Sequence, residues 1–347
     1  YYTLGGGQRT YTAGVGTSIR LTDTIYFGLS LDGGPSYLNL HYARDTALER
    51  GHGAGGIDSD CNGSPCGVGN PLAAEHYDIN VQTSLFSTSS LIANFGFLIN
   101  LSLLNLPKDT WFGISYHTPP GLATETLFTG TMDVRRAPRD GGDLLHGAAS
   151  VFLTQPARAD AELRARLPAE LDLHIAARWE DLSRFQAYDV RGYGSTFNAA
   201  QIPQWQLRPR GFHDPLAMWA GVEQVELVRE DYKVRFGGRV GFETSSLRDE
   251  LTSPSTISPF SYTADVGAEV RTGPLVLQAT YGLQYFPTVN VTDSAFDPRS
   301  RIACIASNYD YASAACTDVR NGYGLPTADG RYDRLEHAIR IALTLDI

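Results

Sequence analysis

The chain has 347 residues, including 35 glycines and 18 tyrosines, and only 19% of them are charged, against about a quarter in typical soluble domains. This composition favours an all-β protein with a large surface that does not face water. The net charge of -10 and the lack of a basic cluster exclude nucleic-acid binding, and the lack of about 18 consecutive apolar residues argues against transmembrane helices.

Alternating apolar and polar residues predict strands from the start of the chain. Residues 9–21 alternate, a tight turn at Thr22-Asp23 follows, and residues 24–42 alternate again. The next stretch, over about 43–84, is rich in glycine and polar residues, and we expect it to be a long loop.

The next pair of expected strands has the same arrangement. Residues 91–104 carry apolar side chains at most odd positions, and the turn Pro107-Lys108-Asp109 leads into a returning strand over 110–134. A second long connection is expected over about 135–156.

The segment 157–181 allows two interpretations. As strands, residues 161–167 and 171–179 each have one apolar and one charged face, separated by a turn at Pro168-Ala169-Glu170. As a helix, it contains many Ala, Leu, Glu and Arg residues, which are good helix formers. Strands are favoured because the charged face would line a lumen.

The rest of the chain repeats the pattern. The further expected strands are 216–228, 232–243, 260–270, 275–285 and 335–347. The further expected loops are about 191–214, 248–259 and 287–332. The final strand has one apolar face, interrupted only by His337.

Short turns and long loops therefore alternate, which is typical of an outer-membrane barrel and not of a soluble sandwich. The fold class is all-β, a transmembrane antiparallel barrel forming a single domain over 1–347, with about eleven strands in this chain. Single-chain bacterial barrels have even strand numbers, so an odd number of strands is expected from a preceding segment or a second chain.

The four cysteines form two close pairs in expected loops, Cys61 with Cys66 and Cys304 with Cys316. Local pairs in polar loops predict disulfides in an oxidising compartment, while unpaired thiols in a reduced cytosol are the alternative. No signal peptide opens the sequence, so we expect a mature chain or a fragment.

One loop has part of a calcium motif. Asp58, Asp60 and Asn62 are spaced like the first oxygen ligands of a calcium loop, and a glycine follows them. The closing glutamate is missing because Gly69 stands at the twelfth position. A polar surface loop is therefore the alternative, and no other cofactor is expected.

Four stretches in order along the chain carry a family resemblance. They are Gly14-Val15-Gly16 with Leu21-Thr22-Asp23, then Asp109-Thr110-Trp111-Phe112-Gly113, then Arg178-Trp179-Glu180-Asp181-Leu182-Ser183, and Gly211-Phe212-His213-Asp214. This set resembles the FadL-type transporters, which carry long-chain fatty acids and aromatic hydrocarbons across the Gram-negative outer membrane. The resemblance implies a barrel of about fourteen strands with an N-terminal hatch, a hydrophobic channel and a lateral opening. The sequence matches from the fourth strand onward.

The resemblance also suggests ligand-binding residues. His213 stands where some members have a lysine near the fatty-acid carboxylate, and Arg235 matches an arginine of the following strand. Arg178 and Arg239 join them because their positions in the strands face inward. The alternative is that these inward cations pair with carboxylates across a wet lumen. The carboxylates considered are Glu162, Asp172, Glu180, Glu243 and Glu269.

The expected function is passive uptake of hydrophobic molecules through the outer membrane of a Gram-negative bacterium, with outer-membrane lipid and a hydrophobic ligand as partners. The alternative is a structural or adhesive barrel whose disulfide-pinned loops bind other envelope proteins. We expect no enzyme, because no G-x-S-x-G motif occurs and scattered Ser, His and Asp do not define a triad.

Overall fold

The computed structural model shows strands almost throughout the part of the chain that it describes. The described residues are 2–45, 78–88, 90–104, 106, 109–122, 126–138, 141–168, 171–185, 187–194, 205–209, 211–229, 232–249, 252, 259–292 and 330–345. Two short 3-10 helices, η2 (Leu101–Leu104) and η5 (Leu182–Arg184), lie between strands. In these residues no helix is long and apolar enough to cross a membrane.

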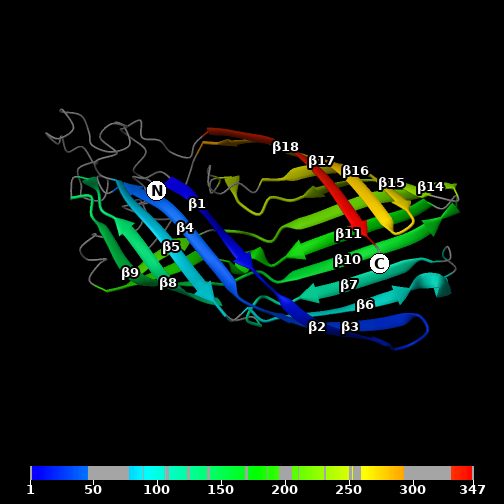
Figure 1. The fold of residues 1–347 in the computed structure, drawn as a ribbon, viewed down its shortest axis with the longest axis horizontal. Coiled ribbons are helices and arrows are strands. Elements are labelled where there is room, and N and C mark those ends of the chain that lie inside the picture. Colours follow the sequence, from blue (N-terminus) through cyan, green and yellow to red (C-terminus); the bar gives the residue numbers. More distant parts are fainter. Residues whose placement is uncertain are drawn as a thin grey trace.

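The strands form two antiparallel sheets that lie end to end (Figure 1). The larger, here called the wall sheet, has eleven strands in the order β18-β17-β16-β15-β14-β11-β10-β7-β6-β3-β2. The smaller, here called the outer sheet, has seven strands in the order β1-β4-β5-β8-β9-β12-β13. The eleven strands of the wall sheet confirm the predicted number, since each expected strand contributes one of them.

The bounds of the strands are as follows. The wall sheet contains β2 (Ala13–Arg20), β3 (Ile25–Gly33), β6 (Ile92–Asn100), β7 (Trp111–His117), β10 (Arg158–Leu167), β11 (Leu171–Glu180), β14 (Leu216–Arg229), β15 (Tyr232–Glu243), β16 (Ser261–Thr272), β17 (Leu275–Val291) and β18 (Gly330–Leu345). The outer sheet contains β1 (Tyr2–Thr10), β4 (Ser36–Asp45), β5 (Asp78–Ser87), β8 (Thr126–Arg135), β9 (Leu144–Leu153), β12 (Ala187–Tyr193) and β13 (Trp205–Pro209).

The predicted short turns gather at one end of the wall sheet. Thr22-Asp23, Asp109 and Thr272-Gly273 all lie at the end that is on the right in Figure 1, away from the outer sheet. Asp109 and Gly273 have positive φ values of 66° and 53°, as tight reversals require. Alternation of short turns with long loops predicts that the short turns share one rim, and the described turns confirm this. Both cysteine pairs lie outside the described residues.

The expected long loops are shorter than predicted. The connection placed over 135–156 was wrong for β9, which is a strand of the outer sheet. Strands β4, β5, β12 and β13 likewise occupy parts of the expected loops 43–84 and 191–214, and the ends of β17 and β18 lie within 287–332. Strands β10 and β11 decide the ambiguous segment 157–181 in favour of the strand prediction.

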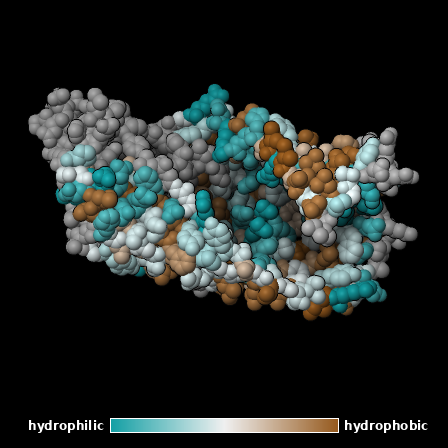
Figure 2. Space-filling view, in the orientation of Figure 1, coloured by the Kyte–Doolittle hydropathy of each residue, from teal (hydrophilic) through white to brown (hydrophobic). Residues whose placement is uncertain are grey.

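The two sheets expose opposite kinds of side chain. The exposed face of the wall sheet is apolar, with Val240 62% and Ile339 76% accessible. Other exposed residues of this face are Val15, Ile19, Leu29, Phe97, Ile114, Val222, Val266, Ile341 and Leu343. Brown side chains over β17 and β18 show part of it (Figure 2). Large apolar side chains facing outward along successive strands are typical of a wall in contact with lipid.

The outer sheet instead buries its apolar face. Its core residues are Leu38, Ile79, Val81, Leu85, Phe128, Met132, Val134, Val151 and Val190. Its exposed positions include Asn39, Gln82, Ser84, Thr129 and Thr131, and next to the wall sheet also the apolar residues Tyr37, Phe86 and Leu127. The outer sheet therefore suits water, and the wall sheet suits a bilayer.

Labelling of intact cells checks this placement. We expect Asn39→Cys, on the exposed face of the outer sheet, to react with a membrane-impermeant maleimide, because that face lies outside the bilayer. Asp23→Cys should react only after cells are disrupted, since its turn lies at the opposite end and its side chain is 95% accessible. The unaltered chain gives the background, and the reverse result would invert the topology.

Candidate functional site: the lumen face

Hydrogen bonds define the second face of the wall sheet, which we call the lumen face. Asn94 donates to Ser30 across 2.9 Å, and His117 bonds Asn94 across 2.6 Å. His117 then lies 3.3 Å from Asp160, to which Arg178 donates across 2.8 Å. These residues come from five adjacent strands, so their side chains share one face. Hydrophilic residues gather in the central hollow of Figure 2.

The three predicted arginines all lie on the lumen face, and each has a carboxylate partner. Arg178 contacts Asp160 at 2.8 Å, and its guanidinium also lies 5.4 Å from the ring centroid of Trp219.

The other two arginines are paired with acids of neighbouring strands. Arg239 contacts Asp265 at 2.6 Å, and Arg235 contacts Glu223 at 3.4 Å. The inward direction inferred from strand alternation agrees with these contacts, and so does the ion pairing considered as the alternative to ligand binding.

None of these partners is among the five carboxylates considered in the sequence. Asp172 accepts from Arg164 and Arg166 at 2.8–2.9 Å, so it holds two other cations. Glu162 bonds His174 at 3.1 Å, and Glu269 accepts from Gln278 at 2.7 Å. The difference arises because strand register, which the sequence alone does not reveal, decides which side chains are neighbours.

His213 lies far from the arginine with which the resemblance grouped it. Its backbone N–H donates to the carbonyl of Ser246 beyond the outer ends of β14 and β15, while Arg235 lies near the other end of β15. Thr244 lies nine residues after Arg235 in the chain and bonds to Leu216 at the outer end of β14. A strand rises about 3.3 Å per residue, so about 25–30 Å separates Arg235 from this outer end. His213 and Arg235 therefore cannot hold one carboxylate together.

Two of the stretches that carry the family resemblance meet at the outer end of the wall. The carboxylate of Asp214 accepts from the backbone N–H of Ser183 at 2.8 Å, and the rings of Phe185 and Phe212 lie 5.5 Å apart. These contacts hold the segment that follows β11 against the segment that precedes β14. Their role in this structure is to join strands.

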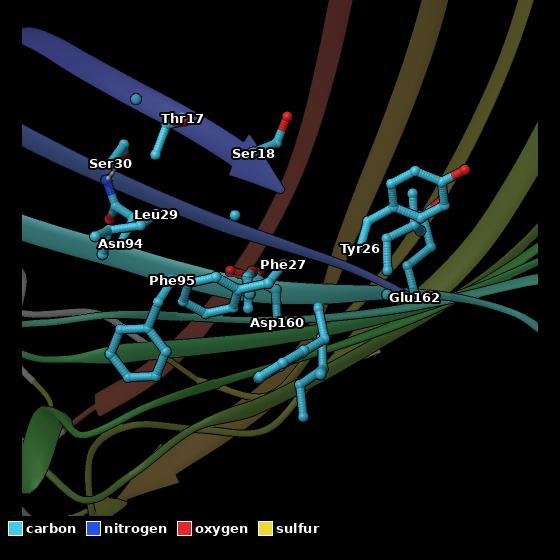
Figure 3. Close-up of a pocket in the computed structure, with 18 of the residues that line it drawn as sticks. Thr17, Ser18, Tyr26, Phe27, Leu29, Ser30, Asn94, Phe95, Asp160 and Glu162 are labelled. Carbon is cyan, nitrogen blue, oxygen red and sulfur yellow. Dashed lines mark hydrogen bonds between the residues drawn. The ribbon is translucent and has the colours of Figure 1, made fainter. Parts of the chain in front are cut away.

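Two hollows lie on the described part of the lumen face. The first, of about 590 Å³, lies over β10, β11 and β14–β18 and includes Arg235, Arg239 and Arg340. Arg340 has no partner among the described residues, unlike the other two. The second, of about 730 Å³, lies over β2, β3, β6, β7 and β10 (Figure 3). Glu162 lines both, so the hollows are neighbours.

Asp160 is the centre of the polar contacts between the hollows, and its loss is expected to destabilise the wall. Asp160→Asn removes the charge that holds Arg158 and Arg178, each at 2.8 Å, and should lower the free energy of unfolding by about 1–2 kcal/mol after allowance for solvent. Urea unfolding in detergent measures this loss. Asp189→Asn, which affects one arginine of the outer sheet, is the control and should change stability less.

The calcium and disulfide predictions concern residues outside the described part of the chain. Asp58, Asp60 and Asn62 lie there, as do Cys61, Cys66, Cys304 and Cys316. Within the described ranges no three His, Asp or Glu side chains are grouped as metal ligands. Disulfides Cys61–Cys66 and Cys304–Cys316 stay a prediction, for which peptide mass spectrometry without reduction should detect both links; a Cys66–Cys304 link would contradict it.

Solved structures of similar fold identify the architecture. No protein-family model matches the sequence, and no curated protein matches it. The crystal structure of a Pseudomonas aeruginosa FadL homologue aligns with a TM-score of 0.67 and 15% identity, over 99% of this chain and 69% of that one.

Two toluene transporters also align. TbuX of Ralstonia pickettii gives a TM-score of 0.53 and 15% identity over 82% of this chain and 64% of its own. TodX of Pseudomonas putida gives 0.52 and 12% over 82% of this chain and 66% of its own. The chain thus spans about two thirds of the length of these transporters.

The fold and the two-faced wall define the class. This chain has the fold of the FadL-type β-barrels of the Gram-negative outer membrane, as the sequence resemblance predicts. Its exposed apolar face is the surface that such a barrel turns to lipid, and its hydrogen-bonded face lines the lumen.

Proposed function

We propose that this chain forms part of the wall of an outer-membrane channel through which hydrophobic small molecules enter the cell. The observation that carries the proposal is the combination of a lipid-facing apolar surface with a hollowed lumen face on the same eleven strands. The solved structures of similar fold support it, because two of them are toluene transporters. They also favour transport over catalysis.

The candidate ligand residues are the lumen arginines. Arg235 and Arg239 border the 590 Å³ hollow, and a ligand carboxylate could bind there by displacing Glu223 or Asp265. Arg178, held by Asp160, lies nearer the outer end, and His213 lies beyond it. A long amphiphile could therefore meet these cations one after another, whereas a hydrocarbon needs none of them.

Uptake by whole cells tests the proposal. A Gram-negative host without a hydrocarbon channel of its own, expressing this protein in its outer membrane, should accumulate radiolabelled toluene or oleate faster than cells without it. A labelled disaccharide serves as the control for nonspecific leakage. Equal uptake of both labelled hydrophobic probes with and without the protein would refute the channel.

One observation favours a structural role as the second candidate. The outer sheet has its own packed core, with Phe128 and Met132 fully buried, and such a rigid part beyond the membrane could bind envelope proteins. Envelope proteins that crosslink specifically to Asn39→Cys, in a protein that transports neither probe, would support this role instead.

A further inference from the structure

We propose that the apolar part of the cargo passes along one side of the lumen only, over the strands β2, β3, β6 and β7. This inference rests on the proposed function, and it assigns the route within the channel. It follows from the distribution of charge around the lumen face, from the shape of the 730 Å³ hollow and from the side chains at its inner end.

The lumen face is divided into a charged and an uncharged side. On β10 every lumen-facing residue of the strand is charged: Arg158, Asp160, Glu162, Arg164 and Arg166. Charges continue on the lumen faces of β11, β15 and β16. On β2, β3, β6 and β7 the only charged lumen-facing residues are Arg20 and Asp32, and each lies at the end of its strand.

The uncharged side is also hollow. Its floor contains Gly28, Gly96 and Gly113, with Ser18 and Ser115 beside them. Thr17 and Ser18 lie on one side of this hollow, and Asp160 and Glu162 lie on the other (Figure 3).

Two of these glycines are not required by the packing of the wall. A Cβ atom on Gly113 would meet nothing closer than 3.8 Å, and on Gly28 nothing closer than 4.0 Å. Gly96 differs, since a Cβ there would lie 2.7 Å from the carbonyl of Ile114. Side chains at positions 28 and 113 would therefore extend into the lumen without disturbing the sheet, and their absence leaves the hollow open.

Apolar side chains border the inner end of the hollow. Leu98 is 45% accessible although it is on the lumen face, where it pairs with Tyr26 and Gly113. The ring of Tyr26 lies 6.0 Å from that of Trp111. These three side chains offer an apolar surface inside the barrel, whereas on the β10–β16 side the ring of Trp219 lies beneath the guanidinium of Arg178.

Charge complementarity selects an uncharged occupant for this side. Covering the ion pairs of β10, β11, β15 and β16 with a hydrocarbon would remove water from them without replacing its hydrogen bonds, which is unfavourable. Covering glycine, Leu98 and Tyr26 removes apolar surface from water, which is favourable at about 25 cal/mol per Å². An aromatic hydrocarbon, or the tail of an amphiphile, therefore follows the uncharged side. The head group of an amphiphile can reach the arginines of the neighbouring 590 Å³ hollow, because Glu162 lines both hollows.

Filling each side in turn tests the route, with toluene as the probe. Gly113→Phe should reduce uptake of labelled toluene at least about fivefold, because the added ring occupies the hollow. Ala342→Phe adds the same ring to the lumen face of β18 and should leave toluene uptake within about twofold of the unaltered protein. Gly28→Leu is the second variant for the uncharged side, and Gly113→Ala should retain most uptake.

The controls separate the possible failures. Heat-modifiable gel mobility shows that each variant is folded before uptake is compared. Equal loss in Gly113→Phe and Ala342→Phe, or a greater loss in Ala342→Phe, would overturn the one-sided route. A protein that takes up no toluene before any substitution would refute the proposed function, and the route would be refuted with it.

Discussion

Replacing Val266 by arginine is expected to destabilise the protein in the membrane, lowering its free energy of unfolding by about 2–4 kcal/mol. Val266 is 59% accessible, lies midway along the apolar face of β16 and pairs with Tyr281 on β17. A cation there would face hydrocarbon at the middle of the bilayer. Urea unfolding of the protein in lipid vesicles measures the loss.

A matched substitution on the lumen face is the control. Gln278→Arg introduces the same side chain next to Glu269, to which Gln278 now donates at 2.7 Å. It should change stability by less than about 1 kcal/mol, because the new charge meets water and a carboxylate. Equal destabilisation by Val266→Arg and Gln278→Arg would mean that the two faces have been assigned wrongly.

The second large expected effect is on ligand selectivity, that is, on the affinity for a fatty acid relative to that for a hydrocarbon. Arg235→Gln should weaken oleate binding about tenfold or more, since a charge-assisted hydrogen bond contributes about 1.5–3 kcal/mol. Toluene binding should not change, because that ligand has no carboxylate. Equilibrium binding of the two labelled ligands to purified protein measures both effects.

A second variant, at the carboxylate partner of Arg235, makes this experiment more specific. Glu223→Gln removes the carboxylate that lies 3.4 Å from Arg235, so the freed guanidinium should bind oleate more tightly than in the unaltered protein. If Arg235→Gln weakens both ligands alike, the substitution has damaged the wall. Unchanged oleate binding in both variants would assign the head of the acid to another place.

Alternation predicted the wall sheet well because lipid imposes it. A strand with hydrocarbon on one side carries apolar side chains at every second position, and the final strand shows this without interruption from Ile339 to Leu345. The short turns were equally visible, since Thr22-Asp23 and Thr272-Gly273 separate alternating segments.

The outer sheet was predicted only in part, since the expected strands 24–42 and 110–134 include most of β4 and β8 but do not separate them from β3 and β7. Its strands expose polar residues and bury apolar ones, and β9 contains Gly147-Ala148-Ala149, where small residues weaken the alternation. Stretches of this kind resemble loops when only the sequence is considered, which is why 135–156 was assigned as a connection.

The sequence predicts that the arginines of the candidate site face the lumen, but it does not predict which carboxylates they contact. Arg178, Arg235 and Arg239 face the lumen because of their position in the strand, which the sequence shows. Their carboxylates come from neighbouring strands and depend on register, as the pairing of Arg239 with Asp265 illustrates. The uncharged side of the lumen was not predicted. The sequence does contain a signal for it, because no charged residue occurs between Ala93 and Pro107.

The reversal of polarity between the two sheets has a mechanical consequence for the surrounding bilayer. On β16 the apolar face runs from Tyr262 to Val270, which covers about 20–25 Å of membrane thickness for a tilted strand. A typical hydrocarbon core is about 30 Å thick. At the end of the outer sheet next to the wall, Tyr37, Phe86 and Leu127 extend this apolar face, but the polar residues Asn39, Ser84 and Thr129 beyond them cannot enter hydrocarbon, so the lipid must match this limited height. The protein is accordingly matched to a thin membrane, such as the bacterial outer membrane, and in a thicker one it would deform the lipid around it.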